Sequence, residues 1–217
     1  MAKKETIVVF GAHPDDFVIG AGGTIKNYLK EKKNIISVVF SLGEKSHIWL
    51  KDKVIKDMRK KETLDANKII GDKRNKVMFL DLGDQNIYSD YQKEKWEHKL
   101  LTLLNQKKPT KLFTHSNEDP HPDHKAVHKI TLELYDKMET KPELYIYSVW
   151  NPVSFKTEHP AFYVDISKTF SVKLKALGAF KSQKFHILYP FFLLLVKTIW
   201  DGFKIRKRFA EKFFRIK

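Results

Sequence analysis

Two short segments about a hundred residues apart are rich in side chains that bind metal ions. The first, AHPDD at residues 12–16, directly follows an apolar run. The second, THSNEDPHPDHKAVH at residues 114–128, holds four histidines and three acidic residues. The chain has no cysteine, so a metal ion can be held only by His, Asp or Glu side chains. The two segments therefore predict a metal site, provided that the fold brings them together.

The stretch GAHPDDFVIGAGGTI at residues 11–25 could be compared with a dinucleotide-binding loop, because it follows an apolar run and ends in glycines. The glycine pattern G-x-G-x-x-G of such loops is missing. Two carboxylates stand where a pyrophosphate should approach the backbone. They would repel a phosphate and suit a cation, which favours a metal site.

Hydrolytic zinc sites usually take three His or carboxylate ligands and leave one position for water, whose pKa the metal lowers from about 15.7 to about 7. His13 and Asp16 lie in one tight loop, stiffened by Pro14, and can bind the same ion. Asp15 between them points elsewhere and suits a general base.

The second segment can supply the third ligand and an imidazole beside a developing oxyanion. Within HPDH we assign His124 to the metal and His121 to the oxyanion, with Asp123 orienting His121. Spacing alone does not fix this division of roles.

Strands and helices alternate along the chain, and the strands are compact apolar runs. Strands are expected at 6–12, 34–41, 76–82, 111–115, 143–150 and 161–166, and helices at 23–33, 52–70, 92–106 and 122–138. In the helix at 52–70, Val54, Ile55, Met58, Leu64 and Ile69 recur at broadly helical spacing.

This alternation predicts an α/β fold, a Rossmann-like three-layer sandwich with a mostly parallel sheet. In the doubly wound order 3-2-1-4-5, the first and fourth strands are neighbours, and ligands bind beyond their carboxyl ends. The AHPDD loop follows the first strand, and the histidine-rich segment follows the fourth. The two clusters should therefore meet at the switch point of the sheet.

The length of 217 residues and the lack of an internal linker indicate a single domain over residues 1–217. The apolar run at 6–12 is followed by two acids without a cleavage site, which favours a buried strand over a signal peptide. The run ILYPFFLLLV at 187–196 has about half of the roughly 20 residues that a membrane-spanning helix needs. We expect a soluble, cytoplasmic protein.

The two motifs together point to one family. AHPDD and HPDH at this separation resemble the motifs of the zinc-dependent PIG-L/LmbE-type deacetylase family. Supporting pieces are GAGGTI after the first motif, the Arg, Glu, Ala and Ile-Gly pattern in 59–71, KALGAFKSQ at 175–183 and AEKF near the end. The resemblance implies removal of an acetyl group from an N-acetylglucosamine-type sugar or glycoconjugate, a carbon-nitrogen hydrolase acting on a linear amide.

By motif position, the resemblance implies one Zn²⁺ per chain, although a His-His-Asp set also suits iron, cobalt or nickel. The implied roles are those assigned above: ligands His13, Asp16 and His124, base Asp15, and His121 assisted by Asp123. Arg59 and Asp84 match positions that contact sugar in relatives, Asp84 only loosely.

One position departs from the family pattern. Phe17 follows Asp16 where the family usually has glutamate, which puts in doubt the support of the loop and the finer substrate preference.

The remaining polar residues of the second segment are expected to have structural roles or to contact substrate. His128 is expected to be a helix residue near the site, and His115, Glu118 and Asp119 are expected to shape the loop or the substrate rim. The other histidines carry no motif and are expected to be structural or exposed: His47, His98, His159 and His186.

The net charge is +15, and residues 197–217 hold eight Lys or Arg against Asp201 and Glu211. The segment at about 190–217 interleaves aromatic and basic residues and is predicted to be helical. It could pack on the domain or on another subunit, or lie peripherally on the inner membrane surface. A nucleic-acid partner is disfavoured, because no recognised binding motif accompanies the charge.

Two other functions stay open at this point. An amidase acting on another small-molecule conjugate would use the same site, and a non-catalytic membrane- or anion-binding module would not need it.

Overall fold

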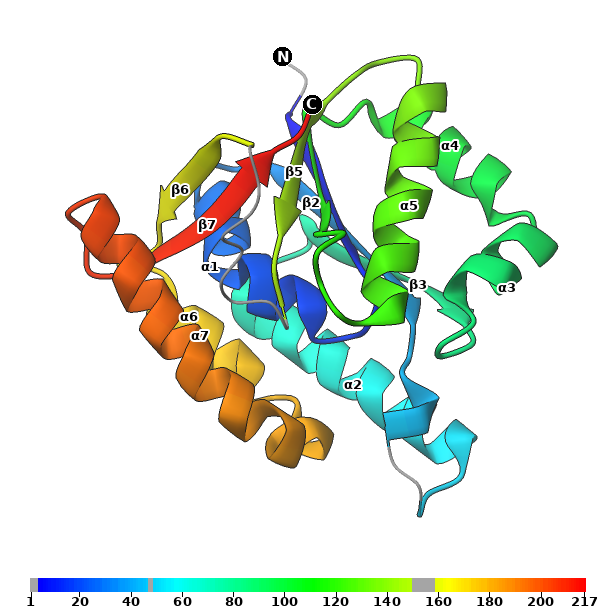
Figure 1. The fold of residues 1–217 in the computed structure, drawn as a ribbon, viewed down its shortest axis with the longest axis horizontal. Helices are drawn as coiled ribbons and strands as arrows, with labels where there is room; N and C mark the ends of the chain where they lie inside the picture. Colours follow the sequence, from blue (N-terminus) through cyan, green and yellow to red (C-terminus); the bar gives the residue numbers. More distant parts are fainter. Residues whose placement is uncertain (1–3, 47–48, 150–158) are drawn as a thin grey trace.

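The computed structural model describes residues 4–46, 49–149 and 159–217, and only the backbone of 184–191 (Figure 1). His47 and Trp150 lie outside this part of the chain, and the strand predicted at 143–150 ends at Tyr147. The strands are β1 (Thr6–Gly11), β2 (Asn34–Ser41), β3 (Asn75–Leu82), β4 (Lys111–His115), β5 (Glu143–Tyr147), β6 (Ala161–Asp165) and β7 (Ala210–Arg215). The helices are α1 (Asp16–Lys30), α2 (Asp52–Ile70), α3 (Ile87–Lys93), α4 (Trp96–Lys107), α5 (Pro122–Lys137), α6 (Phe170–Leu177) and α7 (Lys184–Lys204), with short 3-10 turns η1 (Glu44–Ser46) and η2 (Lys181–Gln183).

The described strands form one sheet in the order β3-β2-β1-β4-β5-β7-β6. The pairs from β3 to β5 are parallel, and β7 runs antiparallel to both β5 and β6. The predicted α/β class, the mostly parallel sheet and the order of the first five strands are confirmed.

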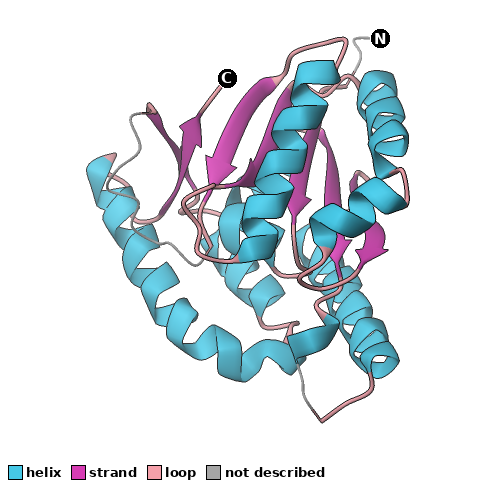
Figure 2. Cartoon of the chain, turned by 45° about the vertical axis from the view of Figure 1, so that its right-hand side comes forward, coloured by secondary structure: helices cyan, strands magenta, loops and turns pink. Residues whose placement is uncertain are grey.

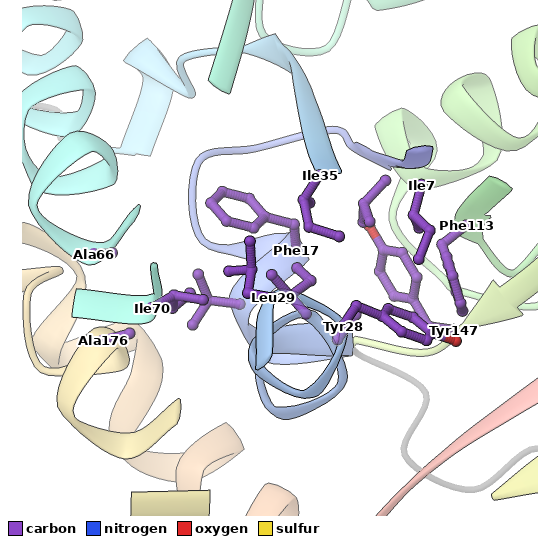
Figure 3. Packing of buried hydrophobic residues seen from close by; sticks show 14 of the residues in the cluster. Ile7, Phe17, Tyr28, Leu29, Ile35, Ala66, Ile70, Phe113, Tyr147 and Ala176 are labelled. Carbon is purple, nitrogen blue, oxygen red and sulfur yellow. The ribbon is translucent and has the colours of Figure 1, made fainter. Parts of the chain in front are cut away.

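Helices cover both faces of the sheet, which gives three layers (Figures 1 and 2). Alternate residues of β1 point to opposite faces: Ile7 and Val9 pack with α1, α2 and α6, and Val8 and Phe10 pack with α3, α4 and α5. Both apolar layers are buried, which is why the strands read as nearly continuous apolar runs. Figure 3 shows the first layer, where Phe17 of α1 lies among Ile35, Leu29 and other apolar side chains.

The C-terminal segment differs from its prediction. It was expected to be helical over about 190–217, but α7 ends at Lys204 and residues 210–215 form β7. Phe213 of β7 packs edge-on against Phe113 of β4, with ring centroids 5.0 Å apart, and is fully buried. Aromatic residues in this strand therefore complete the core, although their basic neighbours suggested a surface helix.

Two helix predictions also need correction. The helix predicted at 92–106 is two helices, α3 and α4, separated where Lys95 adopts a left-handed conformation with φ 54°. The helix predicted at 23–33 begins earlier, at Asp16, so that it starts directly in the AHPDD loop.

The buried side of α2 is not the apolar stripe that its sequence suggested. Val54, Leu64 and Ile69 are exposed, and only Ile55 of the expected residues is fully buried. The side that faces the domain carries polar residues as well, since Arg59, Glu62 and Thr63 are buried. This helix packs its polar side toward the site.

A buried ion pair ties the C-terminal strand to α1. Lys173 Nζ lies 2.6 Å from Glu211 Oε1, and both side chains are almost completely buried. The Glu211 carboxylate accepts hydrogen bonds from the backbone N–H groups of Gly23 and Thr24, and Lys173 Nζ donates to the carbonyl of Ile19. These contacts hold the middle of α1, whose first turn carries Asp16.

Candidate metal centre and cleft

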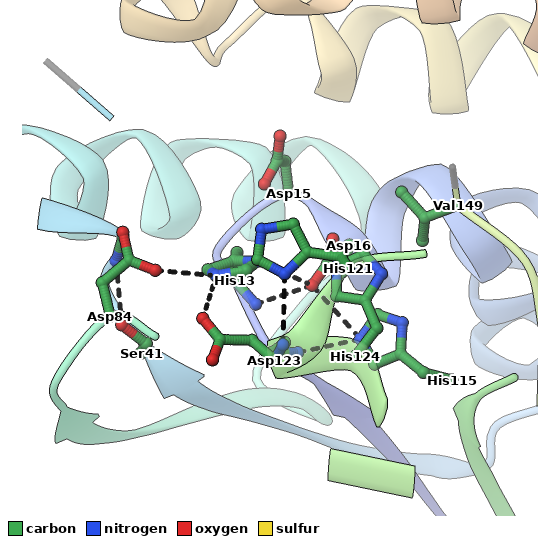
Figure 4. A network of polar contacts seen from close by, with 12 residues as sticks. His13, Asp15, Asp16, Ser41, Asp84, His115, His121, Asp123, His124 and Val149 are labelled. Carbon is green, nitrogen blue, oxygen red and sulfur yellow. Dashed lines mark hydrogen bonds and ion pairs between the residues drawn. The ribbon is translucent and has the colours of Figure 1, made fainter. Parts of the chain in front are cut away.

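The site lies at the carboxyl ends of β1 and β4, which are adjacent parallel strands. α1 leaves β1 toward one face of the sheet, and α5 follows β4 on the other face. This is the switch point that the sequence predicted. The two motifs, far apart in sequence, are in direct contact there (Figure 4).

The AHPDD loop folds onto itself through Asp16. The backbone N–H of His13 donates to Asp16 Oδ2 at 2.6 Å, and the N–H of Asp16 reaches the carbonyl of His13 at 3.3 Å. Asp16 is buried, and its pKa lies well below the usual value, because the nearby charged His124 outweighs the effect of burial. The loop therefore presents an ionised carboxylate at the start of α1.

The second motif begins α5. His121 is the N-cap residue, its Nδ1 accepting a hydrogen bond from the N–H of Asp123 at 3.2 Å, and Pro122 occupies the first turn. This cap fixes His121 at the rim of the site and aims the next turn, with His124, inward. His124 is completely buried.

Asp16 lies between two histidines from the two motifs. Its Oδ2 is 3.6 Å from His13 Nδ1, and its Oδ1 is 3.5 Å from His124 Nε2. Two ligand atoms of a tetrahedral zinc ion, each about 2.1 Å from the metal, are roughly 3.4 Å apart. Each histidine is thus close enough to Asp16 to share an ion with it, in each case through a different oxygen of the carboxylate.

The far nitrogen of each of these two histidines faces carboxylates. His124 Nδ1 is 3.0 Å from Asp119 Oδ1, and His13 Nε2 is 3.2 Å from Asp123 Oδ2 and 3.3 Å from Asp84 Oδ1. Metal-binding histidines typically have such an outer carboxylate, which orients the ring and raises its basicity. The inner nitrogens are left for Asp16 and for a cation.

An unpaired buried nitrogen is a further sign that these residues could bind a metal ion. His124 Nε2 is buried and makes no hydrogen bond within the described residues, although buried polar atoms are normally paired. Burial by itself would lower the pKa of His124, but Asp16 and Asp119 raise it to about 9. The cluster therefore has an excess of negative charge that a cation would neutralise.

The groups of three possible ligands that lie closest together in the described part of the chain share residues with the predicted set His13, Asp16 and His124 but do not reproduce it. Three groups have their ligand atoms within 4.8 Å of one another: His13, His121 and His124; Asp16, His115 and His124; and His13, Asp84 and Asp123. The structure thus contains a buried His/Asp cluster that could hold a metal, and it narrows the ligands to a small overlapping set.

His115 is more central than the sequence suggested. It is completely buried, its ring stacks on that of His124 with centroids 3.9 Å apart, and its Nε2 accepts the N–H of Ala12 at 2.9 Å. Burial and the nearby His124 lower the pKa of His115 to about 4, so the ring is neutral. With the Nε2 lone pair engaged by Ala12, His115 acts as a spacer that joins β1 to β4.

Two predicted neighbours of the site are found close to it. His128 Nδ1 lies 2.9 Å from the carbonyl of His115, which agrees with its reading as a helix residue near the site. Asp119 is fully buried against His124, a role that sequence reasoning missed. The only signal for it was an acid inside the histidine-rich segment.

A cleft of about 230 Å³ opens above the cluster. Of the residues predicted for the site, His13, Asp15, Asp16, Arg59, Asp84 and His121 line it. His124 and Asp123 lie beneath it, buried. The rest of the wall comes from Ile19, Lys45, Ser46, Gln85, Val149 and Gln183.

Asp15 reaches the cleft with Arg59 beside it. Arg59 Nη2 donates to Asp15 Oδ1 at 3.1 Å, and Nη1 donates to the carbonyl of Gly43 at 3.2 Å. Gly43 has a φ of +66°, and a Cβ atom there would lie 1.8 Å from Arg59 Nη1. Glycine is therefore needed for the guanidinium group to approach.

The Asp123 carboxylate does not contact the His121 ring among the described hydrogen bonds. It accepts from the N–H of Gln85 at 2.9 Å and faces His13, and it is the backbone N–H of Asp123 that bonds His121. Asp84 likewise faces His13 and accepts from the N–H of Lys45. The orientation of His121 therefore comes from the helix cap.

The remaining predictions concern residues away from the cluster. Phe17, which replaces the usual glutamate, is fully buried in the apolar core and does not enter the polar network. His98 and His159 are exposed, as expected, and the side chain of His186 is outside the described part.

Comparison with known proteins agrees with the sequence motifs. The family model described as PIG-L, GlcNAc-PI de-N-acetylase, matches residues 8–135, more than half of the chain. A Bacillus cereus protein named "Probable N-acetyl-alpha-D-glucosaminyl L-malate deacetylase 2" is 25% identical over 194 residues, covering 83% of this chain and 84% of its own length.

Solved structures share the fold. The N,N'-diacetylchitobiose deacetylase from Pyrococcus horikoshii superimposes with a TM-score of 0.80 at 23% identity, over 98% of this chain and 84% of that one. A 4-carboxy-2-hydroxymuconate hydratase from Pseudomonas putida gives a TM-score of 0.83 at 21% identity, over 98% of this chain and 96% of that one. The same scaffold therefore occurs in proteins named as deacetylases and in one named as a hydratase.

Proposed function

This chain belongs to the PIG-L (GlcNAc-PI de-N-acetylase) family, and on that premise we propose that it is a zinc-dependent N-deacetylase of an N-acetylglucosamine-type sugar or glycoconjugate. The observation that carries the proposal is that Asp15 and His121 line one cleft directly above His13, Asp16 and His124. A proposed general base, a proposed oxyanion partner and the candidate metal ligands are thus within reach of one small substrate.

We propose His13, Asp16 and His124 as the ligands. Asp16 lies 3.6 Å from the His13 ring and 3.5 Å from the His124 ring, and each histidine has an outer carboxylate. His115 is a weaker candidate, because its Nε2 already accepts the N–H of Ala12. When bound, the ion would make water acidic enough to ionise near neutral pH and would polarise the acetamide carbonyl.

Asp15 is proposed as the general base and then the general acid. Its carboxylate is held at the cleft by Arg59 and can accept the proton of the attacking water. The carbon–nitrogen bond then breaks, and Asp15 returns the proton to the leaving amine. The products are the free amine of the sugar and acetate.

His121 is proposed to donate a hydrogen bond to the developing oxyanion. Its Nδ1 accepts the N–H of Asp123, which puts the ring proton on Nε2. Burial, followed by the charges of His13 and His124, lowers the pKa of His121, so a neutral ring supplies this proton as a fixed donor. Arg59 and Asp84, which line the cleft, are proposed to contact the sugar.

The experiment is acetate release from N-acetylglucosamine, diacetylchitobiose and an N-acetylglucosaminyl glycoside with an anionic aglycone, comparing zinc-loaded with chelated protein. Zinc-dependent release from any of these supports the proposal. No release, with one metal ion still bound per chain, would redirect the site to another amide. If the protein bound no metal, the proposed function would be wrong.

A further inference from the structure

The part of helix α7 whose side chains are described, from Phe192 on, turns large apolar side chains to the outside of the molecule. It runs along the periphery in both views of the fold (Figures 1 and 2). The side chains that it turns inward include Thr198 and Asp201, which are 2% and 1% exposed. A surface helix normally does the reverse and buries its apolar stripe.

The outward side of α7 forms one continuous apolar face. Its members recur at helical spacing and are 46–75% exposed: Phe192, Val196, Ile199, Trp200 and Phe203. The rings of Trp200 and Phe203 stack with centroids 6.3 Å apart. The face spans about 16 Å along the helix axis. Five large apolar side chains in one row exceed the scattered exposure that a soluble surface usually shows.

Cations follow this face directly. Lys204, Arg206, Lys207 and Arg208 are all exposed, and Lys204 Nζ lies 5.9 Å from the Trp200 ring centroid. An apolar, aromatic face beside a basic cluster is the composition of helices that lie in the headgroup region of an anionic bilayer. None of the described helices is long and apolar enough to cross a membrane.

We propose that α7 docks this apolar face on an anionic membrane surface, with the cluster at residues 204–208 on the lipid headgroups. Aromatic rings at the interface and cations against anionic lipid each favour this partner. A second copy of the chain is a poorer match, since a symmetric contact centred on Trp200 and Phe203 would bring the two cation clusters together. Gln183, which directly precedes α7, lines the cleft, so the docked helix begins at the candidate site.

The test is co-sedimentation of the full chain with vesicles of phosphatidylcholine alone or mixed with equal phosphatidylglycerol. We expect binding to the mixed vesicles and at least about tenfold weaker binding to the neutral ones. The double variant Trp200→Ser/Phe203→Ser should lower binding to mixed vesicles by at least about tenfold. Both side chains are mostly exposed, so the fold should be kept, which circular dichroism checks.

The matched control removes exposed apolar side chains from another helix. Val54→Ser/Leu64→Ser on α2 should bind the mixed vesicles like the wild type, because these residues lie outside the proposed face. Lys204→Glu/Arg206→Glu should weaken binding while leaving the apolar face intact.

Three results would overturn the proposal. The first is that the wild type does not bind mixed vesicles. The second is that the Trp200→Ser/Phe203→Ser variant binds them as well as the wild type does, which would show adsorption by charge alone. The third is a concentration-dependent dimer in analytical ultracentrifugation that the same variant dissociates, without vesicle binding. That result would assign the face to a second copy.

Discussion

The guanidinium group of Arg59 donates to the carboxylate of Asp15 across 3.1 Å, and it does so from a helix whose polar side faces the domain. Both side chains are largely buried. The pair joins α2 to the AHPDD loop and holds the proposed base at the wall of the cleft. A substitution of Asp15 therefore affects both the base and a buried cation.

The variant Asp15→Asn separates these two effects. The amide oxygen can still accept from Arg59 but cannot take a proton, so we expect turnover to fall by about 10²- to 10⁴-fold with metal content and stability nearly unchanged. Acetate release, bound zinc and thermal unfolding are measured together. Near-normal turnover would show that the base is another group.

Asp15→Ala serves as the comparison. It removes the acceptor as well and leaves the Arg59 charge buried without its carboxylate, so we expect it to be less stable than Asp15→Asn. Equal stability of the two variants would indicate that Arg59 does not depend on this pair.

The proposed ligand His124 can be tested against a histidine four residues later on the same helix. His124→Gln should lower zinc affinity by more than about 100-fold, whereas His128→Gln, which changes a contact with the His115 carbonyl, should retain one zinc per chain. Elemental analysis after dialysis checks both. Asp119→Asn should fall between them, at about 10- to 100-fold, because Asp119 orients the His124 ring and also accepts the N–H of His121 without being a proposed ligand.

Equal zinc content in His124→Gln and the wild type would exclude His124 as a ligand. The overlapping group around His13, Asp84 and Asp123 would then become the better candidate.

Two histidines, His115 and His128, should each cost the metal-free protein stability in mild acid. Burial lowers the pKa of His115 to about 4 and also lowers that of His128. Below about pH 6.5 the unfolded chain binds protons that these folded rings do not, so stability present above this pH is lost as the pH falls toward 4. For His115 the loss approaches about 3 kcal/mol.

His13 and His124 act in the opposite direction between pH 7 and about pH 5.5, because their folded pKa values are raised and the folded rings already hold protons there that the unfolded rings bind only in part. Comparing His128→Gln with the wild type cancels this contribution. Urea unfolding at pH 7 and pH 5 in a chelator measures the effect. His128→Gln should lose less free energy of unfolding than the wild type when the pH falls from 7 to 5. An identical change would mean that His128 does not contribute.

Glu211→Gln should destabilise the protein by about 3–5 kcal/mol, because it leaves the Lys173 ammonium buried without its partner. Lys173→Met/Glu211→Gln removes that unpaired charge and should recover part of the loss. Chemical denaturation of the two single variants and the double variant gives the coupling energy. Additive losses would show that the two side chains do not act as a pair.

The sheet could be predicted from sequence patterns because its central strands are buried on both faces. For that reason β1, β2 and β4 appear as compact apolar runs between polar turns. Sequence patterns failed for β7, where Glu211 is buried by an ion pair that no local pattern signals. They failed again for α2, whose apolar residues Val54 and Leu64 are exposed while Arg59 is buried.

The residues of the candidate site were likewise predicted in part. His13, Asp15, Asp16, His121 and His124 were found from two motifs, because a switch point between neighbouring strands brings loops together whatever their separation in sequence. Asp119 and the spacer His115 were undervalued, because their positions depend on the stacking of rings and on a backbone hydrogen bond from Ala12.

The clamp of Glu211 on α1 also has a consequence for the order of folding. It joins residues 188 positions apart, so it cannot form in a growing chain until residue 211 has been synthesised. A nascent chain that has not reached Glu211 already contains every proposed catalytic residue, but the helix that begins at Asp16 is not yet held. We therefore expect the site to reach its final packing only after β7 has been synthesised.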